Sequence, residues 1–375
     1  MSVVEEIKKK REKIEKEKDQ EKLQNDFDLR QMDGVGDVRY KRLVEAGIKD
    51  LMGLVICDAR QISRVTGMDE KRAFDMISKA RTILSEKGTI KKSVLTGSEF
   101  EDIEKETTKY ISAGCKNLDT LMTGGIKLRS LTELYGEFGS GKTQICHTVA
   151  VICTQPVEKG GLSGNIIWFN SERTYTPKRM RQIAEARGFI PSVKEEDFKK
   201  ADGSWKDEDC YKKAMKEQDK AVKKMWDRIT ILEPHDSAHQ IYMLDHIGDY
   251  IKPNTKLLII DSITAMFRQE FLGRGELAER QNAIGQHLAK LQRIAQNYDL
   301  AVLYTNQVLS DPAKSWGDPT KPSGGHILGH TSTYRIYLKK SGSKKIAKME
   351  DSPEHPQAEA LYKLTLSGVE DADES

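Results

Sequence analysis

Short apolar runs alternate with amphipathic stretches through the second half of the chain. Runs with the length and composition of buried strands are 165–170, 229–232, 256–261, 300–305, 333–338 and 360–366. Helical patterns at 177–188 and 276–298 lie between successive runs. Strands that alternate with helices usually pair into a parallel sheet with helices on its faces. We therefore expect an α/β core with a largely parallel sheet wrapped by helices.

A glycine-rich loop joins a short apolar strand, 131–135, to an apolar helix that starts near Gln144. The loop fits the pattern Gly-x-x-x-x-Gly-Lys-Thr, with Gly136, Glu137, Phe138, Gly139, Ser140, Gly141, Lys142 and Thr143. Such a backbone points successive N–H groups at a phosphate chain, and the helix N-terminus adds partial positive charge. We expect Lys142 to reach the β- and γ-phosphates and the Thr143 hydroxyl to hold Mg²⁺. A plain turn before a core helix is the alternative, but the strand–loop–helix context favours a nucleoside triphosphate site.

Polar side chains end the strands that should lie beside this loop. Asp261 closes the apolar run 256–261, as a Walker B carboxylate that orients Mg²⁺ does. Glu172 follows the run 165–170, where a carboxylate can polarise the water that attacks the γ-phosphate. Gln307 and Asn306 end the next strand, where an amide can contact the γ-phosphate. Each has a structural alternative. Asp261 could cap a turn, Glu172 could be an exposed acid in a loop, and Gln307 with Asn306 could form an ordinary turn at the end of a strand.

Composition limits the class of protein. The chain has 375 residues and a formal net charge of +3, so nucleic-acid binding must come from local patches. No run of 18 apolar residues and no signal-peptide pattern occurs, which predicts an intracellular protein without a membrane partner. The five cysteines are odd in number and include no Cys-x-x-Cys pair, which disfavours a disulfide scaffold and structural zinc.

The N-terminal third has a different pattern. Residues 1–25 alternate Lys and Glu and predict a charged, partly disordered arm. Residues 26–88 contain two short helical units with glycine turns at 32–36 and 65–68, like a helix–hairpin–helix pair that contacts DNA phosphates. Asp33 replaces the usual proline of the first turn, and a carboxylate there disfavours phosphate contact. A pure packing module is the alternative.

The remaining segments complete the domain organisation. Residues 89–110 lack periodicity and predict a linker before the core, 111–375. Within the core, 194–228 is a charged surface insertion with helical character near 211–226, and 370–375 is an acidic tail that we expect to be frayed.

Two further loops, 267–281 and 308–330, combine glycine with cationic or aromatic residues. The stretches 136–144, 258–262, 273–281, 305–308 and 324–327 together resemble the RecA-like strand-exchange recombinases of the archaeal RadA type. The resemblance spans almost the whole chain from Asp26, apart from the insertion. It implies a RecA-like P-loop ATPase core behind a small all-α helix–hairpin–helix domain, with ATP and Mg²⁺ as cofactors.

The resemblance also implies roles for single residues at the nucleotide. Glu172 is the expected catalytic glutamate, acting with Lys142, and Gln307 couples the γ-phosphate to the second DNA loop. Arg179 stacks on the adenine, and Gln144 completes the nucleotide site. In the family, the glutamate is usually followed by an acyclic polar residue, Thr, Phe and Arg. This chain has Arg173, Thr174, Tyr175 and Thr176 at these four positions, so the arginine of the fourth position is lost.

DNA and neighbouring subunits are the partners that the resemblance implies. The DNA-contacting residues would be Arg268, Arg274, Arg280, Gly324, Gly325 and His326. Subunits would assemble as a helical filament or ring, with the residues Val94, Gly97, Asp351, Pro353 and Pro356 at their interfaces. The family anchor is a Phe followed three residues later by Ala, so Val94 and Gly97 reduce it.

The sequence therefore predicts an ATP-dependent DNA recombinase that forms filaments on single-stranded DNA and pairs it with duplex DNA. It would act as a DNA-dependent ATPase, cytoplasmic and nucleoid-associated in an archaeal-type cell, with recombination mediators as candidate partners. One alternative is a recombinase paralogue that serves as an ATP-binding accessory factor, which the reduced Val94 anchor favours. A non-DNA ATPase ring is a third, which the arginine–glycine loop argues against.

Overall fold

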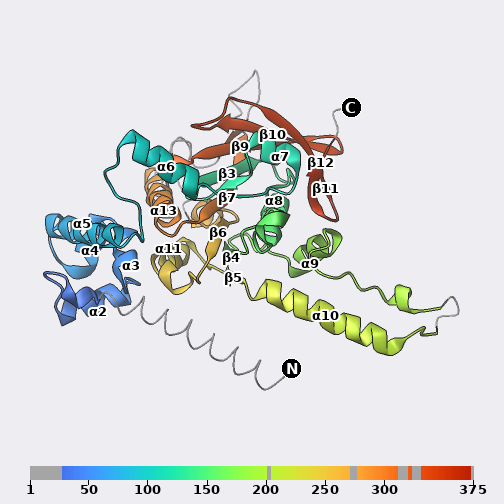
Figure 1. Ribbon diagram of the computed structural model, residues 1–375. Coiled ribbons are helices and arrows are strands. Elements are labelled where there is room, and N and C mark those ends of the chain that lie inside the picture. The colour runs from blue at the N-terminus through green and yellow to red at the C-terminus, as the bar shows by residue number, and fades with distance from the viewer. Residues whose placement is uncertain (1–27, 201–203, 271–276, 311–319, 323–330, 373–375) are drawn as a thin grey trace. The chain divides into compact units, whose positions relative to one another are not determined.

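The computed structural model describes residues 28–200, 204–270, 277–310, 320–322 and 331–372. The charged arm 1–25 lies outside the described residues. The chain forms two compact units, one of Met1–Val94 with Asp245–Asp249 and one of Leu95–Leu244 with Tyr250–Ser375 (Figure 1). In the described residues, no helix is both long enough and apolar enough to cross a membrane.

The N-terminal unit is entirely helical in its described part before residue 95. Its elements are η1 (Leu29–Gln31), α2 (Asp37–Glu45), α3 (Leu51–Val55), α4 (Ala59–Thr66) and α5 (Glu70–Glu86). Aspartates start three of the helices, because the side chains of Asp50, Asp58 and Asp69 each accept a backbone N–H from the first turn. Gly67, with φ of 73°, ends α4 in the left-handed conformation and opens the turn to α5. The helical hairpins expected here are therefore present.

Asp33 lies in the first of the two expected hairpin turns. Its carboxylate forms an ion pair with Lys79 of α5 at 2.5 Å. This contact lowers the pKa of the Asp33 carboxyl. The negative charge that disfavours phosphate contact at this turn is thus partly balanced by a lysine of the same unit.

The second unit is built on one large sheet. Its strands are β3 (Leu131–Gly136), β4 (Asn165–Phe169), β5 (Ile229–Leu232), β6 (Thr255–Ile260), β7 (Ala301–Ser310), β8 (Thr320–Pro322), β9 (Tyr334–Ser341), β10 (Lys344–Asp351), β11 (Glu359–Thr365) and β12 (Gly368–Asp371). The strand order is β12-β11-β10-β9-β3-β7-β6-β4-β5, with β8 paired to β7. Strands from β9 to β5 along this order run parallel, and β9 to β12 form an antiparallel extension. The mostly parallel sheet expected from the sequence is confirmed.

Helices cover both faces of this sheet (Figure 1). They are α8 (Lys142–Cys153), α9 (Pro177–Ala186), α10 (Glu208–Trp226), α11 (Ser237–Asp245), α12 (Ala265–Glu270) and α13 (Leu277–Asn297). Strand β6 is buried on both faces: Leu257 and Ile259 join the core cluster that contains α8 and α9, and Leu258 and Ile260 face the other way. Burial of each such side chain contributes about 1.5–3 kcal/mol, so β6 is firmly held at the centre.

The remaining elements are short, and all but η4 belong to the second unit. They are α6 (Gly97–Thr107), β1 (Tyr110–Ile111), α7 (Lys116–Leu121), β2 (Ile126–Lys127), η2 (Val157–Lys159), η3 (Glu195–Phe198) and η4 (Ile247–Asp249). Helix α6 lies inside 89–110, the segment predicted to be a linker without clear periodicity. Its N-terminus is a capping box, in which Thr96 Oγ1 accepts the Glu99 N–H and Glu99 accepts the Thr96 N–H.

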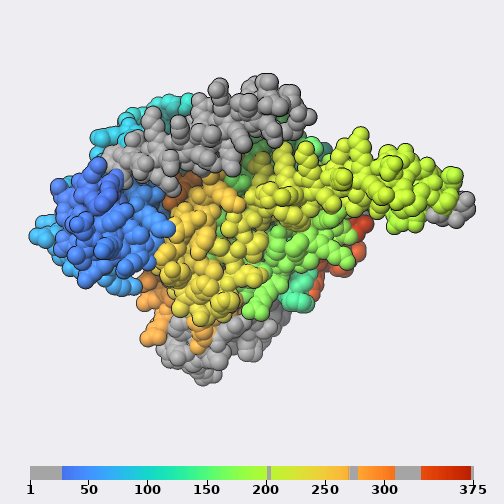
Figure 2. All heavy atoms as spheres, turned by 90° about the horizontal axis from the view of Figure 1, so that it is seen from below, coloured from blue at the N-terminus to red at the C-terminus, as the bar shows by residue number. Residues whose placement is uncertain are grey.

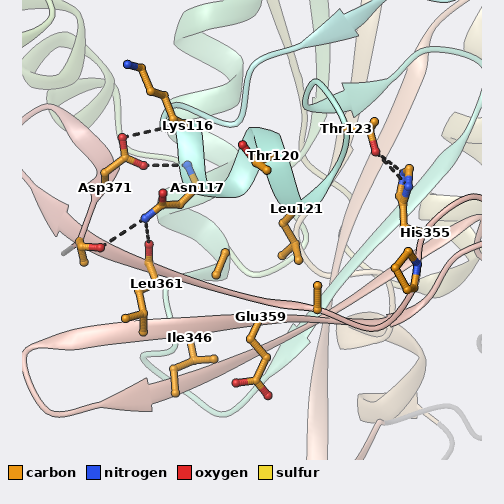
Figure 3. Close-up of a pocket in the computed structure, with 14 residues that line it drawn as sticks. Lys116, Asn117, Thr120, Leu121, Thr123, Ile346, His355, Glu359, Leu361 and Asp371 are labelled. Carbon is orange, nitrogen blue, oxygen red and sulfur yellow. Dashed lines mark hydrogen bonds between the residues drawn. The ribbon is translucent and has the colours of Figure 1, made fainter. Parts of the chain in front are cut away.

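The expectation of a frayed acidic tail is wrong for Glu370 and Asp371, which belong to strand β12. The Asp371 carboxylate accepts backbone N–H groups of Asn117 at 2.8 Å and Lys116 at 3.3 Å, at the N-terminus of α7 (Figure 3). The side-chain amide of Asn117 donates to Leu361 O and Ala372 O. A cap from a distant helix therefore orders residues whose local sequence predicts fraying.

The charged insertion folds as a helical arm. Helix α10 begins at Glu208, three residues before the predicted helical segment, because the Asp207 side chain accepts the Cys210 N–H. Figures 1 and 2 show α10 extending outward beyond α9. At its outer end Tyr211 contacts the rings of Phe198 and Trp205, with ring centroids 5.4 and 5.0 Å apart.

Candidate functional site

The phosphate loop lies between β3 and α8, at the carboxyl edge of the parallel sheet. Gly136 has φ of +157°, and a Cβ there would lie 2.2 Å from the carbonyl oxygen of Leu338, so no larger residue fits. Gly141 is the N-cap of α8 with φ of +102°, which favours glycine. The Ser140 hydroxyl is buried and has no hydrogen-bond partner among the described residues. This tight loop at a helix N-terminus fits a bound phosphate chain.

Lys142 is the cation of the loop. Its Nζ donates to the carbonyl oxygens of Gly136 and Glu137, at 2.8 and 2.9 Å. Burial lowers its pKa, and the carboxylates of Glu172 and Asp261 oppose that shift. The ammonium group is therefore folded over the loop, in the region where phosphate oxygens would compete for it.

Asp261 is a buried carboxylate beside the loop. Its Oδ2 accepts hydroxyl hydrogen bonds from Thr143 and Thr174, each at 2.8 Å, and its Oδ1 accepts one from Thr305 at 2.5 Å. Carboxylate and hydroxyl oxygens suit Mg²⁺, which proteins usually hold through one or two carboxylates together with substrate phosphates. Thr143 and Asp261 thus fit the predicted magnesium site. Thr174 and Thr305 are further contacts that the sequence did not single out.

Glu172 follows β4 and lies at the same edge of the sheet. Its Oε1 accepts hydrogen bonds from Ser262 Oγ at 2.6 Å and from Gln307 Nε2 at 2.9 Å. The other amide atom of Gln307, Oε1, accepts a hydrogen bond from Arg268 at 2.8 Å. Glu172, Arg268 and Gln307 line a cavity of about 470 Å³, together with Ser171, Arg173, His235, Ala265 and Met266. A continuous chain of contacts therefore joins the expected catalytic glutamate to an arginine expected to touch DNA.

Gln144 and Arg179 are adjacent, although 35 positions separate them in the chain. Arg179 Nε donates to Gln144 Oε1 at 2.8 Å. The guanidinium also donates to the backbone oxygens of Thr365, the last residue of β11, and of Leu366, which follows it. Arg179 thus ties α9 to α8 and to the end of β11 beside the loop, while its stacking on an adenine stays a prediction.

The comparisons with known proteins cover nearly all of the chain. The Rad51 family model matches residues 104–209 and 197–372, and a SAM-like helix–hairpin–helix tandem matches residues 27–82. The DNA repair and recombination protein RadA of Cenarchaeum symbiosum (strain A) is 39% identical over 350 residues. That alignment covers 93% of this chain and 80% of the relative.

This chain belongs to the Rad51 family. The two matched segments of the Rad51 model meet at 197–209, within the insertion predicted from the sequence. The predicted resemblance, the fold class and the helix–hairpin–helix domain are thereby confirmed. The roles of single residues stay predictions.

Some predicted DNA-binding residues of this Rad51-family chain have described positions. Arg268 lies in α12, and Arg280 lies in α13 with its buried Nε without a partner among the described residues. The predicted contacts Arg274, Gly324, Gly325 and His326 lie outside the described residues.

The predicted interface residues lie on surfaces. Val94 is 87% exposed, and Gly97 is the first residue of α6. Asp351 ends β10, and Pro353 and Pro356 follow it before β11. Pro356 lines an open cleft of about 1170 Å³ between α7 and the strands β10 and β11 (Figure 3).

His147 of α8 is a neighbour of the site that the sequence did not single out. Its Nε2 accepts the backbone N–H of Thr176 at 3.2 Å, and Thr176 is the N-cap of α9. Burial lowers the pKa of His147 to about 4. A neutral imidazole is needed here, because an imidazolium has no acceptor. His147 therefore satisfies the start of α9, the helix that carries Arg179.

Acid should destabilise the fold through two buried histidines. Burial lowers the pKa of His147 to about 4 and that of His287 to about 3, from 6.5. Between pH 6.5 and these values the unfolded chain binds more protons, so the free energy of unfolding falls as the pH falls. From pH 7 to 5 we expect a loss of about 2 kcal/mol per histidine, measured by urea unfolding.

His287→Gln should remove about half of this pH-dependent loss, since glutamine does not titrate. His235→Gln, at an exposed histidine, is the matched control and should leave the loss unchanged. An equal pH dependence in His287→Gln and the unsubstituted protein would show that other groups cause the acid sensitivity.

Proposed function

We infer that this chain is an ATP-dependent DNA recombinase of the Rad51 family. It hydrolyses ATP in a DNA-dependent manner and pairs a single strand with a homologous duplex. The observation that carries this function is the contact chain Glu172–Gln307–Arg268, which connects the hydrolytic edge of the sheet to the start of the segment 267–281, the expected first DNA-binding segment. The similarity of the protein to the DNA repair and recombination protein RadA of Cenarchaeum symbiosum supports the same function.

The loop and its neighbours would bind the triphosphate. Backbone N–H groups of 137–143 and the Lys142 ammonium would contact the phosphate oxygens, and Thr143 with Asp261 would hold Mg²⁺. An ion held by these two residues would supply positive charge against the charge that develops on the phosphates. Arg179 and Gln144 form the expected adenine side of the site.

Glu172 would act on the attacking water. Ser262 and Gln307 both donate to its Oε1, so Oε2 is the oxygen left to accept a proton from water. Such a general base typically contributes about 10²–10⁴-fold to a rate. Ser262 would serve as a positioning residue, because its hydroxyl donates to the Glu172 carboxylate and so holds its orientation.

Gln307 would couple hydrolysis to DNA. It lies in β7, whose last residues begin the segment 308–330, while Arg268 lies in α12, which forms the start of the segment 267–281. A movement of either loop changes the hydrogen bonds of Gln307 and therefore the position of Glu172. DNA bound through phosphates in these loops would be held without regard to sequence.

Assembly into a filament or ring belongs to the same proposal. The segment 351–356 would cover the ATP of a neighbouring subunit, and Val94 would meet the next core. Val94 offers less apolar area than the phenylalanine of the family pattern, which favours the accessory-factor alternative. Recombination mediators are candidate partners, and association with the nucleoid follows from DNA as the substrate.

Joint-molecule formation by the purified full chain tests the proposal. The chain is mixed with a labelled single strand, ATP, Mg²⁺ and a supercoiled plasmid that contains the homologous sequence. We expect a labelled joint molecule with this plasmid and none with a heterologous plasmid of the same size. ATP and DNA binding without joint molecules would reject the recombinase and favour the accessory factor.

A further inference from the structure

Helix α10 presents one face to the protein and one to solvent. On the inner face, Gln218, Val222 and Met225 are buried. Gln218 Nε2 donates to Glu185 Oε1 of α9 at 3.0 Å and to Pro191 O at 2.8 Å, and its Oε1 accepts from Arg181 at 2.7 Å. The second half of α10 is therefore fixed on the core, and its outer face has a defined direction.

The outer face carries six exposed lysines, which we call the lysine face: Lys212, Lys213, Lys216, Lys220, Lys223 and Lys224. At 100° per residue all six fall within an arc of about 120°, and they span about 18 Å along the helix. Glu217 and Asp219, the acidic residues between Lys212 and Lys224, fall just outside this arc. The face is thus a single strip of positive charge.

The positive charge of this strip is largely unbalanced by neighbouring carboxylates. Lys212 pairs with Glu208 at 2.8 Å, but the other five lysines have no carboxylate within 4.0 Å among the described residues. Lysines four apart, as at 212, 216, 220 and 224, repel by about 0.2–0.5 kcal/mol per pair, whereas alternating charges would attract. The repulsion would be relieved by a polyanion laid along the helix.

The chemistry of the face favours duplex DNA as that polyanion. Single strands usually require aromatic side chains on which bases stack, and the lysine face contains none. Lysines are point charges that suit phosphates and do not read base edges as bidentate arginines do. A duplex presents one phosphate per about 1.7 Å of axis when both strands are counted. A stretch of duplex as long as the face therefore contains about ten phosphates, divided between its two strands.

We propose that the lysine face of α10 binds the sugar-phosphate backbone of duplex DNA. These lysines belong to neither of the segments 267–281 and 308–330, and they follow residues 197–209, where the two Rad51 matches overlap. The proposal rests on the proposed function only in taking DNA as the substrate. It gives the duplex partner of a pairing reaction a surface of its own, independent of sequence and dependent on salt.

The test compares two full-length variants with the same change of charge. The first carries Lys213→Gln, Lys216→Gln, Lys220→Gln and Lys223→Gln, and the control carries Gln at Lys105, Lys109, Lys159 and Lys363, exposed lysines of the same unit. Affinity for a labelled 40-base-pair duplex is measured by fluorescence anisotropy from about 50 to 200 mM salt. Loss of three or four phosphate contacts should lower the slope of log K against log salt by about 2.7–3.6.

We expect the first variant to lose at least tenfold in duplex affinity at 100 mM salt and less than twofold in affinity for a single strand. The control should stay within twofold for both. A variant with Arg at the same four positions should keep duplex binding, which separates loss of charge from damage to α10. Unaltered ATP binding in every variant confirms that the core is folded.

Three results would overturn the proposal. One is an unchanged duplex affinity and salt slope in the first variant, and another is an equal loss for single strands and duplexes. The third is that the protein self-associates without DNA in a salt-sensitive way, and that only the first variant loses this association in sedimentation. The acidic segment 195–209 of a second copy would then be the partner of the lysine face. A protein that binds duplex through this face but forms no joint molecules would reject the recombinase and keep the lysine face.

Discussion

Lys142→Ala is expected to weaken ATP binding by more than a hundredfold. The lysine Nζ lies over the loop, 2.8 and 2.9 Å from two carbonyl oxygens that a phosphate chain would replace as acceptors. A hydrogen bond to a charged group is worth about 1.5–3 kcal/mol, and a phosphate chain offers this ammonium at least two oxygens. A loss of about 3 kcal/mol corresponds to more than a hundredfold in Kd. Equilibrium titration with a fluorescent ATP analogue measures it.

Lys345→Ala is the matched control, because this lysine also donates to a loop carbonyl, that of Gly139, at 3.0 Å. It approaches the loop from strand β10, outside the strand–loop–helix unit. We expect its ATP affinity to stay within about threefold of the unsubstituted protein. Wild-type affinity in Lys142→Ala would reject the assignment of 136–143 as a phosphate loop.

The residues that the sequence located best are those fixed by local pattern. The loop 136–143 has glycine where its backbone requires it: a Cβ at Gly136 would lie 2.2 Å from Leu338 O, and Gly139 and Gly141 have positive φ. Asp261 and Glu172 follow apolar runs, and parallel strands bring such ends to one edge. Local order along the chain therefore predicted both the sheet and the edge that carries the chemistry.

Contacts between distant segments were not predictable in the same way. Ser262 and Thr174 are short hydroxyls without a local pattern, and they gain a role only where the carboxylates of Glu172 and Asp261 approach them. Strand β10 was missed because five of its eight residues are lysines or acids, and pairing with β9 and β11 overrides that composition. Asp371 was assigned to a frayed tail because its partner, the start of α7, is 254 positions away.

The lysine face shows an intermediate case. The helical segment near 211–226 was predicted, and the spacing of its lysines is visible in the sequence. Which side of the helix faces solvent depends on Gln218, Val222 and Met225, whose burial requires the position of α9. The spacing alone puts the lysines on one side of the helix, and the buried inner face shows that this side is the outer one.

Glu172→Gln separates nucleotide binding from turnover and should lower the ATPase rate by about 10²–10⁴-fold. Glutamine keeps the size of the side chain, and its carbonyl oxygen can still accept from Ser262 and Gln307. The amide cannot take a proton from the attacking water. Because Lys142 and Asp261 are untouched, ATP affinity should stay within about threefold. Steady-state phosphate release and equilibrium ATP titration measure the two effects.

Glu233→Gln is the control for this substitution. Glu233 directly follows β5 at the same edge of the sheet, and its carboxylate accepts a hydrogen bond from the Asn170 side chain at 3.0 Å. Among the described residues it makes no hydrogen bond to Glu172, Ser262 or Gln307. Its ATPase rate should stay within about twofold. A near-normal rate in Glu172→Gln itself would remove Glu172 from the catalytic role.

Glu172→Gln also tests whether ATP hydrolysis releases the protein from DNA. If hydrolysis releases DNA through Gln307 and Arg268, Glu172→Gln should remain on single-stranded DNA longer than the unsubstituted protein when ATP is present. Dissociation after a competitor chase measures this dwell time, with a non-hydrolysable ATP analogue as the limit for both proteins. Slow hydrolysis with an unchanged dwell time would keep Glu172 as the general base and reject release by hydrolysis. In that case the contacts among Glu172, Gln307 and Arg268 would transmit DNA binding to the catalytic carboxylate but not the reverse.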